Sequence, residues 1–118
     1  MNAPITLFVY NRKEHTKKTV ESLQKNSLAA KSDLFIFADN YKNDLDKEKV
    51  EKVKGYIKTI SGFKSINIKE NEKNIGLAKS IIAGVTEVVN KYGRIIVMED
   101  DLESSPYFLK FMNDALEK

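Results

Sequence analysis

The chain has 118 residues, the length of one ordinary domain. Its 20 Lys and Arg against 17 Asp and Glu give a small, dispersed positive excess, which argues against a nucleic-acid-binding protein. The hydrophobic content of 42% and charged content of 31% are normal for a folded chain, and the absence of cysteine excludes disulfides, thiolate nucleophiles and cysteine zinc sites. With neither a signal peptide nor a long apolar run, we expect a cytoplasmic protein without a transmembrane segment.

The apolar residues change their period along the chain and predict alternating strands and helices. Residues 5–10 are β-branched and aromatic, and residues 34–38 form an apolar run that is typical of a strand covered on both faces. Residues 65–69 alternate, which predicts a shorter strand nearer a sheet edge, and residues 94–98 form a fourth strand. Helical patterns follow the strands: from His15, from Val50 to Ile60, from Leu77 to Tyr92 with Gly93 behind it, and after Ser105-Pro106.

Four strand-then-helix units without a linker or repeat predict an α/β fold. We expect residues 1–118 to form a single Rossmann-like domain, in which helices cover both faces of a mostly parallel sheet. Ligands of such sheets bind beyond the carboxyl ends of the strands. The segments that end the predicted strands should therefore gather along one rim: Asn11-Arg12, Asp39-Asn40, residues 71–76 and residues 99–101.

Three consecutive acids, Glu99-Asp100-Asp101, follow the last predicted strand. Like charges repel, and because nothing basic adjoins them in sequence, a divalent cation would relieve the repulsion. Their oxygens suit Mg²⁺ or Mn²⁺, which complete their shells with water and a substrate's phosphates. The alternative to a metal site is that the acids lie at the N-terminus of the following helix, whose dipole would stabilise Asp101 and Glu103. The lone histidine, His15, has no acidic or histidine neighbour at helical spacing, and we do not interpret it as a ligand.

Other polar residues at the predicted rim have two interpretations each. Arg12 would hold a phosphate by paired hydrogen bonds, or lie in solvent. Asp39 would accept a hydrogen bond from a ribose hydroxyl or a base N–H, or close an Asx turn. Gly76 opens a helix that carries Lys79 in its first turn, so this helix start either serves an anion or follows an ordinary turn.

Four segments resemble segments of the GT-A glycosyltransferases in their residues and in their order along the chain: Phe8 to Arg12, Phe37 to Asn40, Asn74 to Ser80 and Val97 to Glu103. The last of them, Glu99-Asp100-Asp101-Leu102-Glu103 followed by a proline and aromatics, is most similar to the N-acetylglucosaminyltransferase I type and is the most specific. The first resembles bacterial family 2 glycosyltransferases. The resemblance covers nearly the whole chain.

This resemblance implies the nucleotide-sugar-binding half of a GT-A enzyme, which binds a UDP-sugar through Mn²⁺ or Mg²⁺. It implies that Asp101, in a DXD-type motif, ligates the metal, that Asp100 lies near the ribose and donor sugar, and that Asp39 reads the uracil edge. It places Arg12 near the diphosphate. Further nucleotide-binding roles are implied for Tyr10, Asn11, Lys79 and Glu99.

The second half of the family, which supplies the acceptor site and the catalytic base, follows the DXD-type motif. Because this chain ends at Lys118, we expect a fragment with no catalytic residue of its own and with weak or no transfer activity. The resemblance implies that the full-length protein is a hexosyltransferase-type enzyme. It would transfer the sugar with inversion to a hydroxyl of a glycan, a lipid-linked acceptor or a protein.

Two other functions stay open. A phospho-acceptor receiver domain also holds Mg²⁺ at the rim of a doubly wound sheet, but its paired acids follow the first strand, where this chain has Asn11-Arg12. A non-catalytic interaction domain, in which the acids after the fourth strand belong to a capped helix end, predicts no metal-dependent ligand binding.

Overall fold

The computed structural model describes residues 2–99 and residue 113. Strands and helices alternate as the sequence predicts, and the helix expected after Ser105-Pro106 lies outside the described residues. The elements in chain order are β1 (Ile5–Val9), α1 (Lys13–Gln24), the short 3₁₀ helix η1 (Ala29–Lys31), β2 (Asp33–Ala38), α2 (Asp44–Ile57), β3 (Ser65–Glu70), α3 (Leu77–Tyr92) and β4 (Ile96–Glu99).

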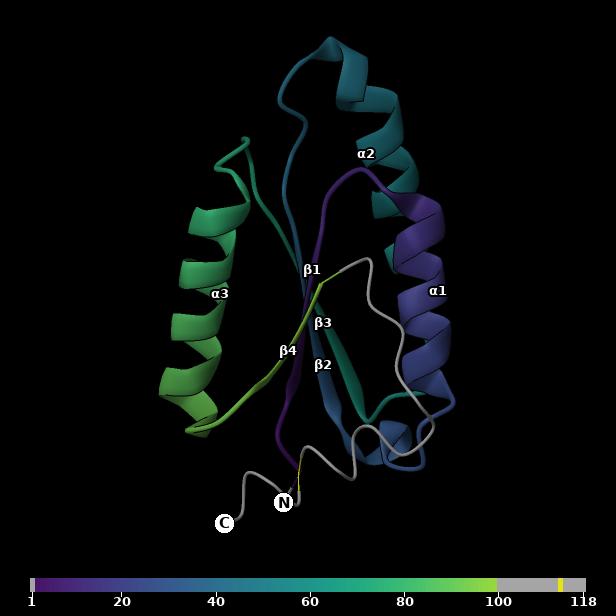
Figure 1. Ribbon diagram of the computed structural model, residues 1–118, viewed down its shortest axis with the longest axis vertical. Coiled ribbons are helices and arrows are strands. Elements are labelled where there is room, and N and C mark those ends of the chain that lie inside the picture. The colour runs from purple at the N-terminus through teal and green to yellow at the C-terminus, as the bar shows by residue number, and fades with distance from the viewer. Residues whose placement is uncertain (1, 100–112, 114–118) are drawn as a thin grey trace.

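The four strands form one sheet in the order β3-β2-β1-β4, and all three neighbouring pairs are parallel. On the central strand β1, Ile5 lies opposite Leu34 of β2 and Ile96 of β4. Figure 1 shows α3 on one side of the sheet and α1 and α2 on the other. The predicted α/β fold with helices on both faces is confirmed, and the carboxyl ends of all four strands lie at the same edge.

Side chains of the central strands alternate between the two faces and build two apolar clusters. Leu7 of β1 is fully buried beneath α1 and α2, where it packs in the same cluster as Leu23. On the opposite face, the rings of Phe8 and Phe37 stack with their centroids 5.4 Å apart and pack with Val88 of α3. The sheet is therefore held between the helices by burial of apolar surface on both sides.

Helix α3 approaches the sheet closely at Gly84. A Cβ atom at this position would lie 2.8 Å from Cε1 of Phe8, which is too close for two carbon atoms, and 3.1 Å from Cδ2 of Phe37, which is a tight contact. Because residue 84 has no side chain, α3 lies directly on the stacked rings. This contact fixes the position of α3 relative to β1 and β2.

Helix α3 begins and ends at glycines with positive φ. Gly76 is its N-cap, with φ of 87° and no capping side chain of its own. Gly93 adopts the left-handed conformation with φ of 80°, and its N–H donates to the carbonyl of Val89 at 2.7 Å. The predicted helix from Leu77 to Tyr92 and its terminal glycine are confirmed.

Helix α2 begins earlier than its apolar spacing indicates. It starts at Asp44, and the side chain of Asn43 caps it by accepting a hydrogen bond from the N–H of Asp46 at 3.2 Å. The apolar spacing from Val50 marks only the buried face, and Ile60 lies beyond the helix end. A polar first turn therefore extends this helix toward the carboxyl edge of the sheet.

Strand β3 lies at the edge of the sheet, as its alternating pattern predicts, and its residues 67–70 are exposed. Strand β4 begins at Ile96, two residues later than predicted, because Arg94 and Ile95 still connect it to the end of α3. Within the part of the chain that the structure describes, no helix has the length and apolar character needed to cross a membrane.

Candidate functional site

A cavity of about 550 Å³ lies at the carboxyl edge of the sheet, between the ends of β1 and β2 and the first turn of α3. It brings together three of the four predicted rim segments: the end of β1, the end of β2 and the loop of residues 71–76. Its lining residues are Phe8, Val9, Tyr10, Asn11, Arg12, Phe37, Asp39, Lys42, Asn74, Gly76, Leu77 and Ser80.

At one wall of the cavity, the end of β1 is hydrogen-bonded to the first turn of α2. The hydroxyl of Tyr10 donates to Oδ2 of Asp46 at 2.7 Å, and Nδ2 of Asn11 donates to Oδ1 of the same carboxylate at 3.2 Å. The backbone N–H of Lys42 donates to the hydroxyl oxygen of Tyr10 at 3.1 Å. These hydrogen bonds fix the side chains of Tyr10 and Asn11 where the predicted ligand would lie.

The Tyr10–Asp46 hydrogen bond joins a neutral phenol to an ionised carboxylate. Burial, followed by the hydrogen bond to Asp46, raises the pKa of Tyr10 above its ordinary value of 10.0. The hydrogen bond from Tyr10 is the largest cause that lowers the pKa of Asp46 below its ordinary 3.8. The two shifts agree, since each favours the protonation state that the hydrogen bond requires.

At the end of β2, the carboxylate of Asp39 is only 6% exposed and accepts five hydrogen bonds. Oδ1 accepts from Nδ2 of Asn71 at 3.0 Å, from the N–H of Ile75 at 3.1 Å and from the N–H of the following residue at 2.9 Å. Oδ2 accepts from the N–H of Gly76 at 3.0 Å and from Nδ2 of Asn74 at 3.2 Å. The buried charge is therefore compensated by the loop of residues 71–76.

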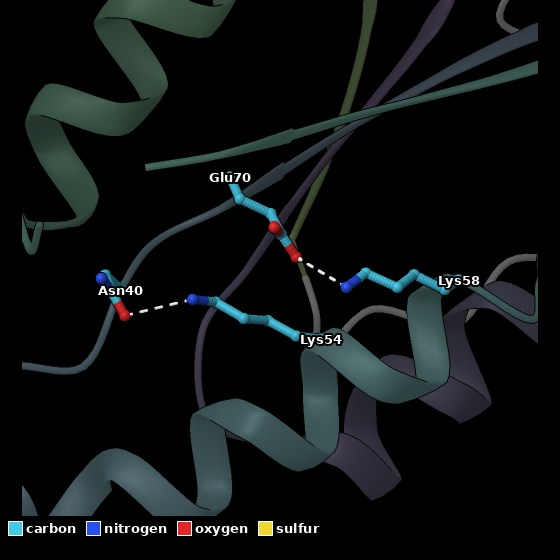
Figure 2. Close-up of polar contacts among 4 residues, drawn as sticks. All are labelled: Asn40, Lys54, Lys58 and Glu70. Carbon is cyan, nitrogen blue, oxygen red and sulfur yellow. Dashed lines mark hydrogen bonds and ion pairs between the residues drawn. The ribbon is translucent and has the colours of Figure 1, made fainter. Parts of the chain in front are cut away.

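Asn40 connects the same loop to α2. Its Nδ2 donates to the carbonyl of Glu72 at 2.7 Å, and its Oδ1 accepts from Nζ of Lys54 at 3.2 Å. Figure 2 shows Lys54 of α2 reaching toward Asn40, and Lys58, directly after α2, reaching toward Glu70. The Lys58–Glu70 ion pair, 3.7 Å long, is largely exposed and contributes little to stability. The contacts nevertheless show that α2 faces the carboxyl ends of β2 and β3.

Arg12 and Lys42 bring positive charge to the cavity, and both side chains are exposed. The two carboxylates nearby, Asp39 and Asp46, are engaged in the hydrogen bonds described above. A guanidinium group binds two oxygens of a phosphate at once, and an ammonium group acts as a point charge beside it. Together with the apolar lining from Phe8, this combination suits a ligand with an anionic part and a larger, less polar part.

The remaining predicted site residues lie elsewhere or outside the described residues. Lys79 is exposed in the first turn of α3 and does not line the cavity. Strand β4 ends at Glu99, so the backbone of Glu99 lies at the carboxyl edge. The side chain of Glu99 and all of Asp100 and Asp101 are outside the described residues. Among the side chains of the described part, no group of three or more His, Asp or Glu is placed to hold a metal ion.

Sequence reasoning missed two residues of this site, Lys42 and Asp46. Both belong to the charge-rich segment before Val50, for which the sequence pattern predicts no site residue. The available signal is Asn43 followed by Asp44 and Asp46, a typical helix start with acids in the first turn. It places the start of α2 beside the end of β2, and thus near the rim.

Comparisons with known proteins agree with this architecture. The sequence matches a family model described as glycosyl transferase family 2 over residues 5–118, whereas a search of curated proteins found no match. The chain is similar in structure to S. aureus TarS, with a TM-score of 0.70 and 13% identity over 99% of this chain and 20% of that chain. It is also similar to S. aureus TarS 1–349, with a TM-score of 0.64 and 13% identity over 99% of this chain and 32% of that one.

At such low identity, the likeness to the two solved structures shows the fold alone. The chain spans between 20% and 32% of the length of these proteins. The family assignment rests instead on the sequence match, which includes all the described strands and helices. The chain belongs to glycosyl transferase family 2.

Proposed function

We propose that the chain is the donor-binding part of a glycosyltransferase and that it binds a UDP-sugar in the cavity at the carboxyl edge. The observation that carries this proposal is the lining of the cavity, where Arg12 and Lys42 lie beside amide donors and an apolar surface. A volume of about 550 Å³ is within the usual range for small-molecule sites. Membership of glycosyl transferase family 2 supports sugar transfer as the reaction.

In this proposal, the diphosphate binds at the positive side of the cavity. Arg12 pairs with phosphate oxygens and Lys42 adds a second charge. Tyr10 and Asn11 meet the nucleotide already oriented by Asp46, so their ordering costs little on binding. Lys79 does not line the cavity and contributes only to the positive potential around it.

The proposal includes a divalent metal, Mn²⁺ or Mg²⁺, at the acidic segment that follows β4. The donor chemistry fits, because carboxylate oxygens suit these hard cations and β4 delivers Glu99 to the edge where the cavity lies. Asp101 would ligate the metal, with Asp100 near the ribose and donor sugar. A bound metal would neutralise the charge that develops on the departing UDP.

Transfer itself is proposed for the whole enzyme. We expect inversion at the sugar carbon and attack by a hydroxyl of a glycan, lipid-linked or protein acceptor, with the acceptor site and the base outside residues 1–118. Orientation and general-base catalysis each contribute on the order of 10²-fold or more. The 118-residue chain should therefore bind the donor but transfer its sugar weakly or not at all. The cytoplasmic location stays a prediction from the sequence.

Calorimetric titration of UDP into the chain, with and without Mn²⁺, tests this function. We expect binding that requires the metal and that weakens at least about tenfold in Asp101→Ala, as the loss of a metal ligand predicts. Glu51→Ala removes an exposed acid of α2 outside the cavity and should bind as the wild type does. Binding that is indifferent to Mn²⁺ and to Asp101 would contradict the metal role. No binding by the folded chain would contradict the donor class and favour an interaction domain.

A further inference from the structure

Strand β3 lies at one end of the strand order β3-β2-β1-β4, so β2 is its single partner among the described strands. The segments on both sides of β3 are described as well, and residues 67–70 of the strand are exposed. Among them is an apolar side chain, Ile68, with 36% of its surface exposed. An edge strand of this kind presents a row of backbone groups to any extended chain that approaches it.

The backbone groups at the edge of β3 can be assigned from its pairing with β2. In a parallel pair, each strand turns the N–H and C=O groups of alternate residues toward its partner. Ala38 of β2 lies opposite Glu70, and its carbonyl accepts a hydrogen bond from the N–H of Asn71 at 2.9 Å. The odd-numbered residues of β3 therefore bond to β2, and the N–H and C=O groups of Ile66 and Ile68 point outward along the edge.

The two faces of β3 carry different side chains. Ile68 lies opposite Ile36, which packs beneath α1 and α2, and Ile66 is on the same face. Asn67 lies opposite Phe35, on the face that α3 covers. If a two-fold axis perpendicular to the sheet related two copies of the chain, each face would stay on its own side. Even-numbered residues of one β3 would then lie opposite even-numbered residues of the other.

An antiparallel register centred on Asn67 gives matching partners along this edge. It places Ile66 opposite Ile68 of the second copy, and the outward backbone groups of these two residues would exchange both N–H···O hydrogen bonds. It also places Lys64 opposite Glu70 of the second copy, and the two-fold axis repeats both pairs. At the centre, Asn67 meets Asn67 of the second copy, and each amide can donate and accept. Apolar pairs and pairs of opposite charge at such positions stabilise a sheet.

The two charged residues of this register are accessible. Lys64 is exposed directly before β3, and its N–H donates to the carbonyl of Ser32 at 3.0 Å, which holds its backbone beside the start of β2. Oε1 of Glu70 pairs with Lys58 of the same chain at 3.7 Å, in a contact that is largely exposed. Because a carboxylate accepts about four hydrogen bonds, Glu70 can bind a second ammonium group as well.

The neighbouring registers that keep the faces aligned lack this match. A register centred on Ile68 would place Ile66 opposite Glu70, and a register centred on Ile66 would place Lys64 opposite Ile68. Each of them sets an apolar side chain against a charged one twice, because the two-fold axis repeats every pair. The pattern of charged and apolar residues along the edge therefore favours the register centred on Asn67.

We propose that the edge of β3 pairs antiparallel with the same edge of a second copy of this chain, in the register centred on Asn67, so that the two sheets join into one. The assembly is a closed dimer, because each copy uses its β3 edge. A contact made chiefly by two six-residue strands is small, so the dimer should be weak and reversible. None of the residues that line the carboxyl-edge cavity belongs to β3, so pairing should leave that cavity open.

Sedimentation equilibrium tests the proposal, and we expect the dimer fraction to rise between about 10 µM and about 1 mM. Lys64→Glu and Glu70→Lys each place like charges opposite one another twice, and each should weaken dimerisation at least about tenfold. An equimolar mixture of the two variants should dimerise as the wild type does, because every facing pair then has opposite charges. Lys18→Glu, an exposed change of the same charge on α1, is the matched control and should dimerise normally.

Two further measurements address the backbone of the edge. Ile68→Pro removes an N–H that points away from β2, and proline is tolerated on edge strands, so this variant should keep the wild-type circular dichroism but stay monomeric. In the wild type, amide hydrogen exchange at Ile66 and Ile68 should slow as the protein concentration rises. Leu7, in the central strand β1, should keep the same exchange rate at all concentrations.

A wild-type chain that remains monomeric at about 1 mM would overturn the proposal. Dimerisation that neither charge reversal weakens, or that mixing the two variants does not restore, would overturn it equally, because the contact would then use another surface or register. Oligomers larger than a dimer would contradict the closed pair. These experiments contain no nucleotide, so their outcome is independent of whether the chain binds the proposed donor.

Discussion

The hydroxyl of Tyr10 and Oδ2 of Asp46 are 2.7 Å apart, and this hydrogen bond joins the end of β1 to the first turn of α2. Asn11 donates to the other oxygen of the same carboxylate. One side chain of α2 therefore orients two neighbouring residues of the cavity wall, although Asp46 does not line the cavity itself. The orientation of this wall of the candidate site therefore depends on a residue of α2 that lies outside the cavity.

Asp46→Asn is expected to lower the pKa of Tyr10 toward its ordinary 10.0. Burial of the phenol, the largest cause of the raised pKa, stays in the variant, but the hydrogen bond to a carboxylate and its negative charge are lost. NMR of ¹³C-labelled tyrosine during a pH titration measures the shift. Tyr56, whose pKa is raised by burial and by Glu21, should titrate identically in both proteins. A Tyr10 pKa that does not move in Asp46→Asn would contradict the assigned hydrogen bond.

The same pair should make stability depend on pH in the acid range. The folded protein lowers the pKa of Asp46 below the 3.8 that holds when the chain is unfolded, chiefly through the hydrogen bond from Tyr10. The contribution of ionised Asp46 to the free energy of unfolding is therefore fully present above the ordinary pKa and is lost as the pH falls through the lowered pKa of the folded state. Urea unfolding at several pH values should give a larger free energy of unfolding for the wild type than for Asp46→Asn at about pH 6, and this difference should shrink toward about pH 2. A difference in the free energy of unfolding that stays undiminished at about pH 2 would refute the lowered pKa of Asp46.

Gly84→Ala should destabilise the fold, whereas Gly55→Ala should not. A Cβ at residue 84 would lie within 3.1 Å of both Phe8 and Phe37, and overpacking of this kind costs about 1–3 kcal/mol, more than the helix gains from alanine. Gly55 of α2 has no atom within 4 Å of such a Cβ, so alanine there should stabilise by about 0.5–1 kcal/mol. Equilibrium urea unfolding measures both changes. Equal effects at the two glycines would show that α3 does not lie on the aromatic pair.

Replacement of Arg12 or Lys42 by alanine should weaken the binding of UDP about tenfold, because a charged hydrogen bond to phosphate is lost. Binding of uridine, which has no phosphate, should change little. Titrations of both ligands into each variant measure the difference, and increased ionic strength should reduce the effect. Lys25→Ala, at the far end of α1 from the cavity, is the matched control. A similar loss with uridine would indicate that these residues shape the cavity and do not bind the diphosphate.

Much of the fold follows from local sequence pattern. The apolar run of β2 predicts a strand covered on both faces, and the alternation of β3 predicts a strand nearer an edge, because burial on two faces or on one leaves different periods. Helix α3 is predicted to the residue because an apolar stripe and a terminal glycine coincide. The start of α2 was not predicted, because its first turn is polar and its local signal is a capping residue, Asn43, with acids in the turn that follows.

The candidate site is harder to predict from the sequence than the fold is, because its contacts join residues that are far apart along the chain. The parallel topology predicts that Arg12, Asp39 and the loop of residues 71–76 meet at one edge, and they do. It does not predict which donors meet Asp39, since those contacts depend on how the loop folds back over the end of β2. Asp46 was missed for the same reason: its partner Tyr10 is 36 residues away.

An NMR titration of the ¹⁵N-labelled chain with UDP and Mg²⁺ tests most directly the claim that the carboxyl-edge cavity is the nucleotide site. We expect the largest amide shifts at Asn11, Gly76 and Leu77, which line that cavity. Shifts that cluster instead around Phe35 and Tyr92, in the groove between β3 and α3, or no shifts at a saturating concentration, would contradict the account.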